Sequence, residues 1–305
     1  MIKVFGHFSP DTDSTGSPLI WAWYLSQVQD TPAQAALLGQ PNSEAKFVLE
    51  HWGIPQPDIL TELPAGAPVV IVDTNNPAEL PATINDADIR AIIDHHKLVG
   101  GLETKGPIDI TMRPLACTAT IMYELIGKHM AQAPRAIKGV MLSCILSDTL
   151  EFRSPTTTQT DRAIAHALAD DLGVDMAELA SAMFAAKSDV SSFSDAELLR
   201  MDSKNFDVDG KKFRVSVLET TAPAQVLARK DSLMASMESV AREDGADQVL
   251  LFIVDILNEE ATLLLPNDLT RALAKKSFGV DATGDSVVLP GVMSRKKQII
   301  PVLAL

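Results

Sequence analysis

The sequence is poor in cysteine and in positive charge, and it has no long apolar run. Its 305 residues include only Cys117 and Cys144, too few for a disulfide framework or a four-cysteine zinc site, and we expect both thiols to be buried on helices. No run of about 18 uncharged apolar residues could span a membrane. The first ten residues, MIKVFGHFSP, lack the basic and apolar regions of a signal peptide. We therefore expect a soluble, cytoplasmic protein.

Basic residues are scarce relative to acidic ones. The chain has 26 Lys and Arg against 40 Asp and Glu, a net charge of −14 with histidine neutral. Long nucleic acids are bound by neutralising their phosphates, so this balance argues against such a partner. Small anions remain possible, because a few local cations or metal ions can hold a phosphate group. An apolar content of 46% is ordinary for a globular protein and excludes a disordered chain.

The length of the chain is about twice that of a typical domain, which favours two domains. In the first 190 residues short apolar runs alternate with helical stretches, a pattern that predicts an α/β domain with a parallel sheet flanked by helices. The expected strands are residues 2–5, 68–72 and 89–93, and the expected helices are residues 14–29, 118–130, 134–146, 160–172 and 175–186.

A polar stretch, SDVSSFSD, predicts a linker at residues 188–194 between a first domain, 1–187, and a second, 195–305. Ser194 and Glu197 have the spacing of a capping box at the start of a new helix. The second domain is predicted to be a smaller α/β unit with a mixed sheet, with helices at 222–243 and 269–277 and strands at 213–218, 249–257, 261–265, 286–289 and 298–303. The strands at 249–257 and 261–265 are expected to form a hairpin.

Acidic and histidine side chains recur where apolar elements end. They are His7, Asp11 and Asp13 after the first strand, Asp73 and the Asp94-His95-His96 run after the next two, and Asp148 after an apolar helix. Taken singly, a helix cap or a surface turn explains the segment after the first strand as well as a functional site does, and it is the better explanation for each of the other positions. Together they would repel one another at one edge of a sheet unless cations held them, and this is the edge where open α/β sheets bind ligands. The pattern therefore predicts a metal cluster of histidine and aspartate.

The ligand types narrow the choice of metal. No cysteine is among these residues, which disfavours a structural zinc site. Mixed imidazole and carboxylate ligands suit Mn²⁺, Fe²⁺, Co²⁺ or Zn²⁺ better than Ca²⁺ or Mg²⁺ alone. Two such ions about 3.5–4 Å apart, bridged by a carboxylate and a hydroxide, are a standard arrangement for cleaving phosphoanhydrides and phosphoesters.

The segments HFSPDTDS, VDTNN, DHH and SDT, in this order, resemble the four motifs of the DHH phosphoesterase superfamily. Near the end of the chain, SRKKQ (residues 294–298) resembles the signature of the family II, manganese-dependent inorganic pyrophosphatases, whose second domain is of the DHHA2 type. The D-x-K at residues 202–204 also matches that domain. The resemblance covers essentially the whole chain. Ser9, where the family usually has asparagine, is the one visible departure.

The resemblance implies six metal ligands. His7 and Asp11 would hold one ion, Asp13, His95 and Asp148 would hold the second, and Asp73 would bridge the two. It also implies that His96 assists protonation of the leaving group, while Asp94 orients an imidazole. Lys204, Arg295 and Lys296 would bind the phosphate oxygens. The alternative for these three basic residues is an ordinary solvated surface.

The implied activity is hydrolysis of inorganic pyrophosphate to two orthophosphates. A hydroxide bridging two Mn²⁺ ions, for which Co²⁺ could substitute, would attack in line, in a site between the two domains. Pyrophosphate would enter with Mg²⁺, and the protein would be a homodimer. Two alternatives remain: another DHH phosphohydrolase, such as an exopolyphosphatase or a nuclease of short oligonucleotides, and a metal-dependent sensor without enzymatic activity. Against the first, the chain lacks the Gly-rich GGGH-type stretch of the other kind of second domain.

Overall fold

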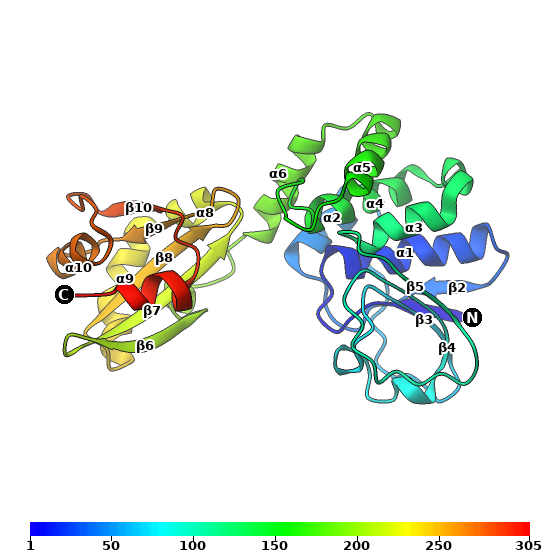
Figure 1. Cartoon of the computed structure of the whole chain (residues 1–305), viewed down its shortest axis with the longest axis horizontal. Coiled ribbons are helices and arrows are strands. Elements are labelled where there is room, and N and C mark those ends of the chain that lie inside the picture. The colour runs from blue at the N-terminus through cyan, green and yellow to red at the C-terminus, as the bar shows by residue number, and fades with distance from the viewer. The chain divides into compact units, whose positions relative to one another are not determined.

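The computed structural model describes residues 1–305, which form two compact units, Met1–Ala186 and Lys187–Leu305 (Figure 1). The first unit contains a five-stranded sheet in which every neighbouring pair is parallel, as expected. Its strand order is β2 (Ala33–Ala35), β1 (Ile2–Phe5), β3 (Pro68–Val72), β4 (Asp88–Asp94), β5 (Asp109–Met112). The two edge strands escaped prediction because they are short and only partly buried, so neither carries a continuous apolar run.

Helices pack around this sheet, and the expected ones are present with shifted ends. They are α1 (Thr12–Gln27), α3 (Thr118–Ile126), α4 (Arg135–Asp148), α5 (Gln159–Leu172) and α6 (Met176–Lys187). A further helix, α2 (Ser43–His51), is not among the expected ones. Helix α1 packs against β1, β2 and β3 and against α3 and α4. Helix α3 ends before the expected position because Gly127 adopts a φ of 55°, after which the chain continues as a 3₁₀ helix.

The strand order of the first sheet by itself indicates where a ligand would bind. Strand β1 lies between β2 and β3, so the direction in which the chain adds strands reverses at β1. Parallel α/β sheets bind ligands at the carboxyl ends of the strands flanking such a reversal. The residues that follow β1 and β3 therefore lie at the position where this fold class places its ligands.

The second unit contains a five-stranded mixed sheet, as expected. The strand order is β10 (Ser286–Pro290), β9 (Glu260–Leu264), β8 (Gln248–Asp255), β7 (Lys211–Thr220), β6 (Ser203–Val208). Only β7 and β8 run parallel, and β8 and β9 form the predicted hairpin. Alternate residues of β8 enter two hydrophobic cores on opposite faces of the sheet. One core includes side chains of α9 (Lys230–Glu243), and the other includes side chains of α10 (Asp268–Phe278).

Two predictions for the second unit are wrong. The expected helix at 222–243 is two helices, α8 (Pro223–Leu227) and α9, separated at Arg229. The side chain of Arg229 donates hydrogen bonds to the carbonyls of Val190 and Phe193, which ties the break to the preceding loop. The expected strand at 298–303 is instead a π-helical turn at Arg295–Ile299 followed by a 3₁₀ turn at Ile300–Val302. Pro301 lacks the N–H that a strand at this position would donate.

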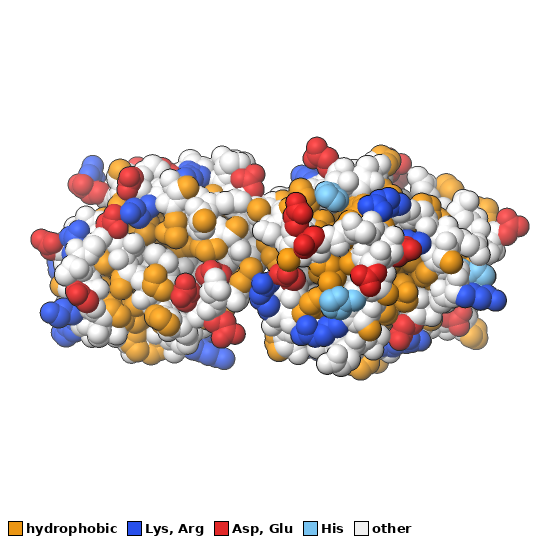
Figure 2. Space-filling view, turned by 90° about the horizontal axis from the view of Figure 1, so that it is seen from above, with side chains coloured by type: hydrophobic (Ala, Val, Ile, Leu, Met, Phe, Trp, Pro, Cys, Tyr) orange, Lys and Arg blue, Asp and Glu red, His pale blue; other side chains and the backbone are white.

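The capping box at Ser194 and Glu197 is present and begins α7 (Asp195–Arg200). No helix in the structure combines the length and the apolar character needed to cross a membrane. Figure 2 shows acidic and basic side chains interspersed on the face that it presents of each unit.

Candidate metal centre and phosphate site

The loop after β1 is shaped by a tight approach between Gly6 and Ser14. A Cβ on Gly6 would lie 2.0 Å from Ser14 Oγ, so only glycine fits there. Ser14 Oγ accepts a hydrogen bond from the backbone N–H of His7 at 2.9 Å. The N-cap of α1 is Asp11, whose Oδ1 accepts a hydrogen bond from the backbone N–H of Ser14 at 2.9 Å. His7 and Asp11 are thereby fixed on opposite ends of one short loop.

Asp73 lies at the centre of the predicted ligands. Its side chain is 2% exposed, with Oδ2 3.5 Å from Nε2 of His7 and Oδ1 3.3 Å from Nε2 of His95. Asp73 has a φ of 59°, a left-handed conformation that costs about 1–2 kcal/mol for a residue other than glycine. Such strain is typical of functional sites. A position between two imidazoles is the one that a bridging carboxylate would require.

Asp13 and Asp148 form a second group beside Asp73, and a cysteine joins them. One potential ligand atom from each of Asp13, Asp148 and Cys117 lies within 4.8 Å of the others. Both cysteines are buried, as expected, but Cys117 directly precedes α3 instead of lying on a helix, and its thiol lies beside the carboxylates of Asp13 and Asp148. Asp13 Oδ1 accepts from the Ser17 hydroxyl and Oδ2 from the Thr118 N–H, each at 2.7 Å.

These carboxylates have the electrostatics of a cation site. Burial, together with the charge of Asp13, raises the pKa of Asp73 to about 6. The same two causes raise the pKa of Asp148 well above its ordinary value. Asp148 Oδ2 is buried and has no hydrogen-bond partner. A divalent cation would relieve both the repulsion and the unsatisfied oxygen, so the residues fit the predicted metal ions.

His95 is oriented as metal-binding histidines usually are. Its Nδ1 lies 3.1 Å from the carbonyl oxygen of Leu115, which is the position of a donated N–H and leaves Nε2 free to face Asp73. Burial alone would lower the pKa of His95. The hydrogen bond to Asp73 and the charges of Asp13 and Asp73 outweigh burial and raise this pKa to about 9.

His96 is held differently from its neighbour. Its side chain is 53% exposed, and its Nδ1 lies 2.9 Å from Oδ1 of buried Asp94. The hydrogen bond to Asp94 raises the pKa of His96. Asp94 Oδ2 accepts from the amide of Asn75 at 2.6 Å, and the Oδ1 of Asn75 accepts from the backbone N–H of Val99 at 2.7 Å. Asn75, which the sequence analysis missed although it lies within VDTNN, thus fixes the chain on both sides of His96.

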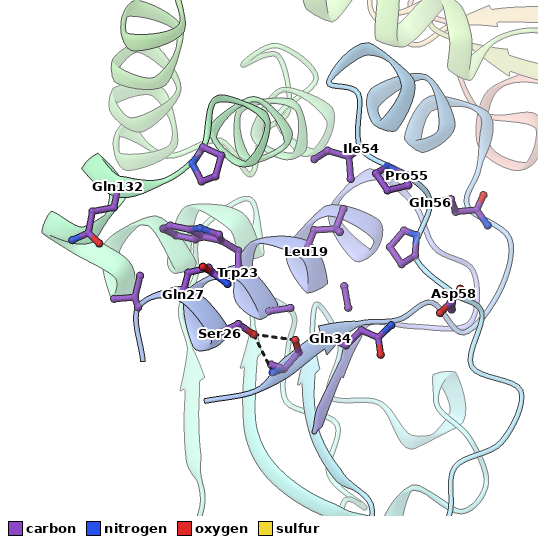
Figure 3. Close-up of a pocket in the computed structure, with 16 residues that line it drawn as sticks. Leu19, Trp23, Ser26, Gln27, Gln34, Ile54, Pro55, Gln56, Asp58 and Gln132 are labelled. Atoms are coloured by element: carbon purple, nitrogen blue, oxygen red, sulfur yellow. Dashed lines mark hydrogen bonds between the residues drawn. The ribbon is translucent and has the colours of Figure 1, made fainter. Parts of the chain in front are cut away.

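A pocket of about 480 Å³ opens beside these side chains and is lined in part by His7, Asn75, Glu79, His96 and Lys97. A larger cavity, about 980 Å³, lies elsewhere, between α1, β2 and the loop at residues 54–58 (Figure 3). None of the predicted ligands lines the larger cavity. The larger cavity is therefore not the one beside the predicted metal ligands. Of the two, only the smaller pocket adjoins the carboxylate cluster.

The predicted phosphate-binding residues lie together in the second unit. Lys204, Arg295 and Lys296 line one pocket of about 470 Å³. Both lysines are exposed, whereas the side chain of Arg295 is 16% exposed and forms an ion pair with Asp202. Gln298 Oε1 accepts from the backbone N–H groups of Met293 and Ser294, which closes the loop that carries Arg295. The basic residues thus lie on a preformed surface.

Two family models match this chain, one over each part of it. The model of the DHH family, N-terminal domain, matches residues 1–147, and that of the DHHA2 domain matches residues 181–304. The chain is 43% identical to a Deinococcus radiodurans protein named "Probable manganese-dependent inorganic pyrophosphatase", over 99% of this chain and 98% of that protein.

Two solved structures are also similar. The first is a Methanococcus jannaschii protein described as a "putative family II inorganic pyrophosphatase", with 34% identity, a TM-score of 0.63 and coverage of 99% of this chain and 98% of that one. The second, an exopolyphosphatase-related protein from Bacteroides fragilis, is 13% identical with a TM-score of 0.52, covering 98% of this chain and 89% of that one. The second likeness shows the fold alone.

Proposed function

Because the chain belongs to the DHH/DHHA2 family of manganese-dependent, family II inorganic pyrophosphatases, we propose that it hydrolyses inorganic pyrophosphate to two orthophosphates. The observation that carries the proposal is the cluster around Asp73, where two other buried carboxyl groups and two imidazoles converge at the switch point of a parallel sheet. Crowded carboxylates of raised pKa are the environment that divalent metal ions stabilise.

We propose two Mn²⁺ ions per chain, for which Co²⁺ could substitute. His7 and Asp11 would hold one ion, Asp13, His95 and Asp148 the other, and Asp73 would contact both. When bound, the ions supply Lewis acidity and a water nucleophile of lowered pKa. The chain itself supplies their geometry: Ser17 and Thr118 orient Asp13, and Leu115 orients His95.

His96 is proposed as the acid that protonates the leaving phosphate. Its Nδ1 faces Asp94, so the proton available to a substrate is on Nε2. Lys204, Arg295 and Lys296 are proposed to bind the phosphate oxygens and to neutralise the charge that develops on them. In this proposal residues of both units act on one pyrophosphate molecule, which we expect to bind with Mg²⁺. Residues 188–194 would connect the metal-binding domain to the phosphate-binding domain.

The assembly and location of the protein are proposed from the same membership. We expect a homodimer in the cytoplasm, with pyrophosphate as the substrate and no role for long nucleic acid. Size-exclusion chromatography with light scattering measures the assembly directly, and a monomeric mass would contradict the proposed dimer.

The function is tested by phosphate release from pyrophosphate, triphosphate and a dinucleotide, each with Mn²⁺ and Mg²⁺. Pyrophosphate should be hydrolysed much faster than the other two substrates. Prolonged chelation should abolish turnover, and Mn²⁺ or Co²⁺ should restore it better than Mg²⁺ alone. Full activity of the chelated protein in Mg²⁺ would contradict the proposed cofactor, and preference for triphosphate or the dinucleotide would contradict the proposed substrate.

A further inference from the structure

One short segment contacts three of the predicted metal ligands. The segment 115–118 precedes α3, and its Leu115 carbonyl is 3.1 Å from Nδ1 of His95. At its other end Thr118 donates its backbone N–H to Asp13 at 2.7 Å and its hydroxyl to Asp73 at 3.2 Å. Asp13 and His95 are proposed ligands of the second ion, and Asp73 is proposed to contact both ions. A shift of this segment would therefore displace all three ligands together.

The segment is fixed from behind by the carboxylate of Asp161, on α5. Asp161 is fully buried, and it accepts a hydrogen bond from the backbone N–H of Ala116 at 3.3 Å and 3.2 Å to its two oxygens. Its Oδ1 also accepts from the hydroxyl of Thr120 at 2.7 Å, which fixes the first turn of α3. One side chain thus fixes the residues immediately around Thr118.

The same carboxylate also belongs to the capping box of α5. Asp161 Oδ2 accepts from the backbone N–H of Thr158 at 2.8 Å and from its hydroxyl at 2.6 Å. All the groups that donate to Asp161 are neutral. An asparagine at this position would keep the shape but turn an NH₂ group toward N–H or O–H donors, so at least one of these contacts would be lost.

We propose that Asp161 is a positioning residue for the second metal ion, acting through the segment 115–118. The inference rests on the proposed function, since it presumes the two ions. It assigns a role to a side chain that the sequence analysis did not single out. Residues behind metal ligands typically change metal affinity about 10–100-fold when replaced. Because Asp161 acts through one further layer of residues, we expect an effect of about tenfold, at the lower end of that range.

Variants of Thr120 and Thr158 distinguish the positioning role of Asp161 from its role in capping α5. Thr120→Val removes the hydroxyl that joins Asp161 to α3 and leaves the α5 cap intact. Thr158→Ala removes the cap hydroxyl and leaves the contacts of Asp161 with Ala116 and Thr120. Thr120→Ser, which keeps a hydroxyl, is the conservative control. None of these residues is a proposed metal ligand.

The experiment measures Mn²⁺ binding to the full-length protein after chelation, by the electron paramagnetic resonance signal of free Mn²⁺, together with the melting temperature without metal. The wild type and Thr120→Ser should bind two ions tightly. Asp161→Asn and Thr120→Val should bind one of the two ions about tenfold more weakly. Thr158→Ala should lower the melting temperature and leave both affinities unchanged.

Unchanged affinities in both Asp161→Asn and Thr120→Val would overturn the proposal and leave Asp161 with a capping role alone. If Asp161→Asn does not fold, Thr120→Val decides by the same criterion. If Thr158→Ala weakened Mn²⁺ binding as much as the other two variants do, the proposal would also be overturned, because the loss of affinity would then follow the loss of stability. A wild type that binds no Mn²⁺ would overturn the proposed function itself, a result distinguishable from failure of the positioning role alone.

Discussion

Arg295 donates two hydrogen bonds to Asp202, one from Nη1 to the backbone carbonyl at 2.8 Å and one from Nη2 to the carboxylate at 2.7 Å. The side chain of Asp202 is 58% exposed, and an ion pair this open to solvent contributes only about 0–1 kcal/mol to folding. Its effect is geometric, since it fixes the guanidinium plane and leaves the remaining N–H groups of Arg295 for a ligand. Asp202, the first residue of the D-x-K motif, thus acquires a function as the support of Arg295.

Replacing Arg295 should impair substrate binding without affecting the metal ions. Arg295→Ala should raise KM for pyrophosphate, lower kcat, or both, because a charge-assisted contact to phosphate is lost. Arg295→Lys should recover only part of the loss, since lysine cannot make a bidentate contact. Asp202→Asn keeps the backbone carbonyl and should have a smaller effect. Lys275→Ala, at an exposed position on α10, is the matched control. Loss of Mn²⁺ from Arg295→Ala, with KM unchanged, would refute this assignment.

Variants of the adjacent residues His95 and His96 should differ in their Mn²⁺ binding. His96→Gln should retain both Mn²⁺ ions and lose turnover by about 10²-fold or more, as expected for the loss of an acid catalyst. His95→Gln should weaken Mn²⁺ binding first, because Nε2 of His95 faces Asp73. His166→Gln, on the exposed side of α5, should change neither quantity. The opposite pattern in the two variants would mean that their roles are exchanged.

The stability of the protein after chelation should fall as pH rises. The pKa of Asp73 is raised from 3.8 to about 6, and that of His95 is raised from 6.5 to about 9. Each side chain therefore binds its proton more tightly in the folded state than in the unfolded state, Asp73 between about pH 4 and 6 and His95 between about pH 6.5 and 9. The stabilisation from protonated His95 is complete below pH 6.5 and lost as pH rises through about 9. Melting temperatures should therefore decline between about pH 4 and pH 9.

Two controls accompany this measurement. His95→Gln should flatten the upper part of the pH dependence. Added Mn²⁺ should stabilise more as pH rises, because metal ligands must lose their protons. A melting temperature of the chelated wild type that rises steadily across this range would contradict the assigned charges.

Gly139 should not tolerate a side chain. A Cβ at this position in α4 would lie 2.2 Å from the ring of Trp52, and that ring is held by a hydrogen bond from Nε1 to Ser143 Oγ at 3.0 Å. Gly139→Ala should therefore destabilise the protein by about 1–3 kcal/mol, despite the better helix propensity of alanine. Denaturant unfolding measures this directly. Gly245→Ala is no control, because Gly245 has a φ of 66°, whereas Gly106→Ala, with open space around it and an ordinary φ, should be close to neutral.

The central strands and the candidate ligands were predictable because local sequence encodes them. Continuous apolar runs ending in aspartate specify a buried strand and a polar group at its end, so Asp73 and Asp94 could be placed without a structure. The edge strands β2, β5 and β6 could not, because short half-exposed strands are defined by their partners. The false strand at 298–303 has the same origin: its apolar residues pack from irregular turns onto the core of the second unit.

By itself, the sequence determined the fold class, the order of the motifs and the residue types able to hold metal and phosphate, since these depend on periodicity and spacing along the chain. Only the tertiary structure decided that Cys117 lies among the carboxylates, that Asn75 supports Asp94, and that Asp161 fixes the segment beside Asp13. Asn75 and Asp94 are 19 residues apart, and Ala116 and Asp161 are 45 apart. Contacts over such separations arise from how the strands and helices pack, and no local pattern records them.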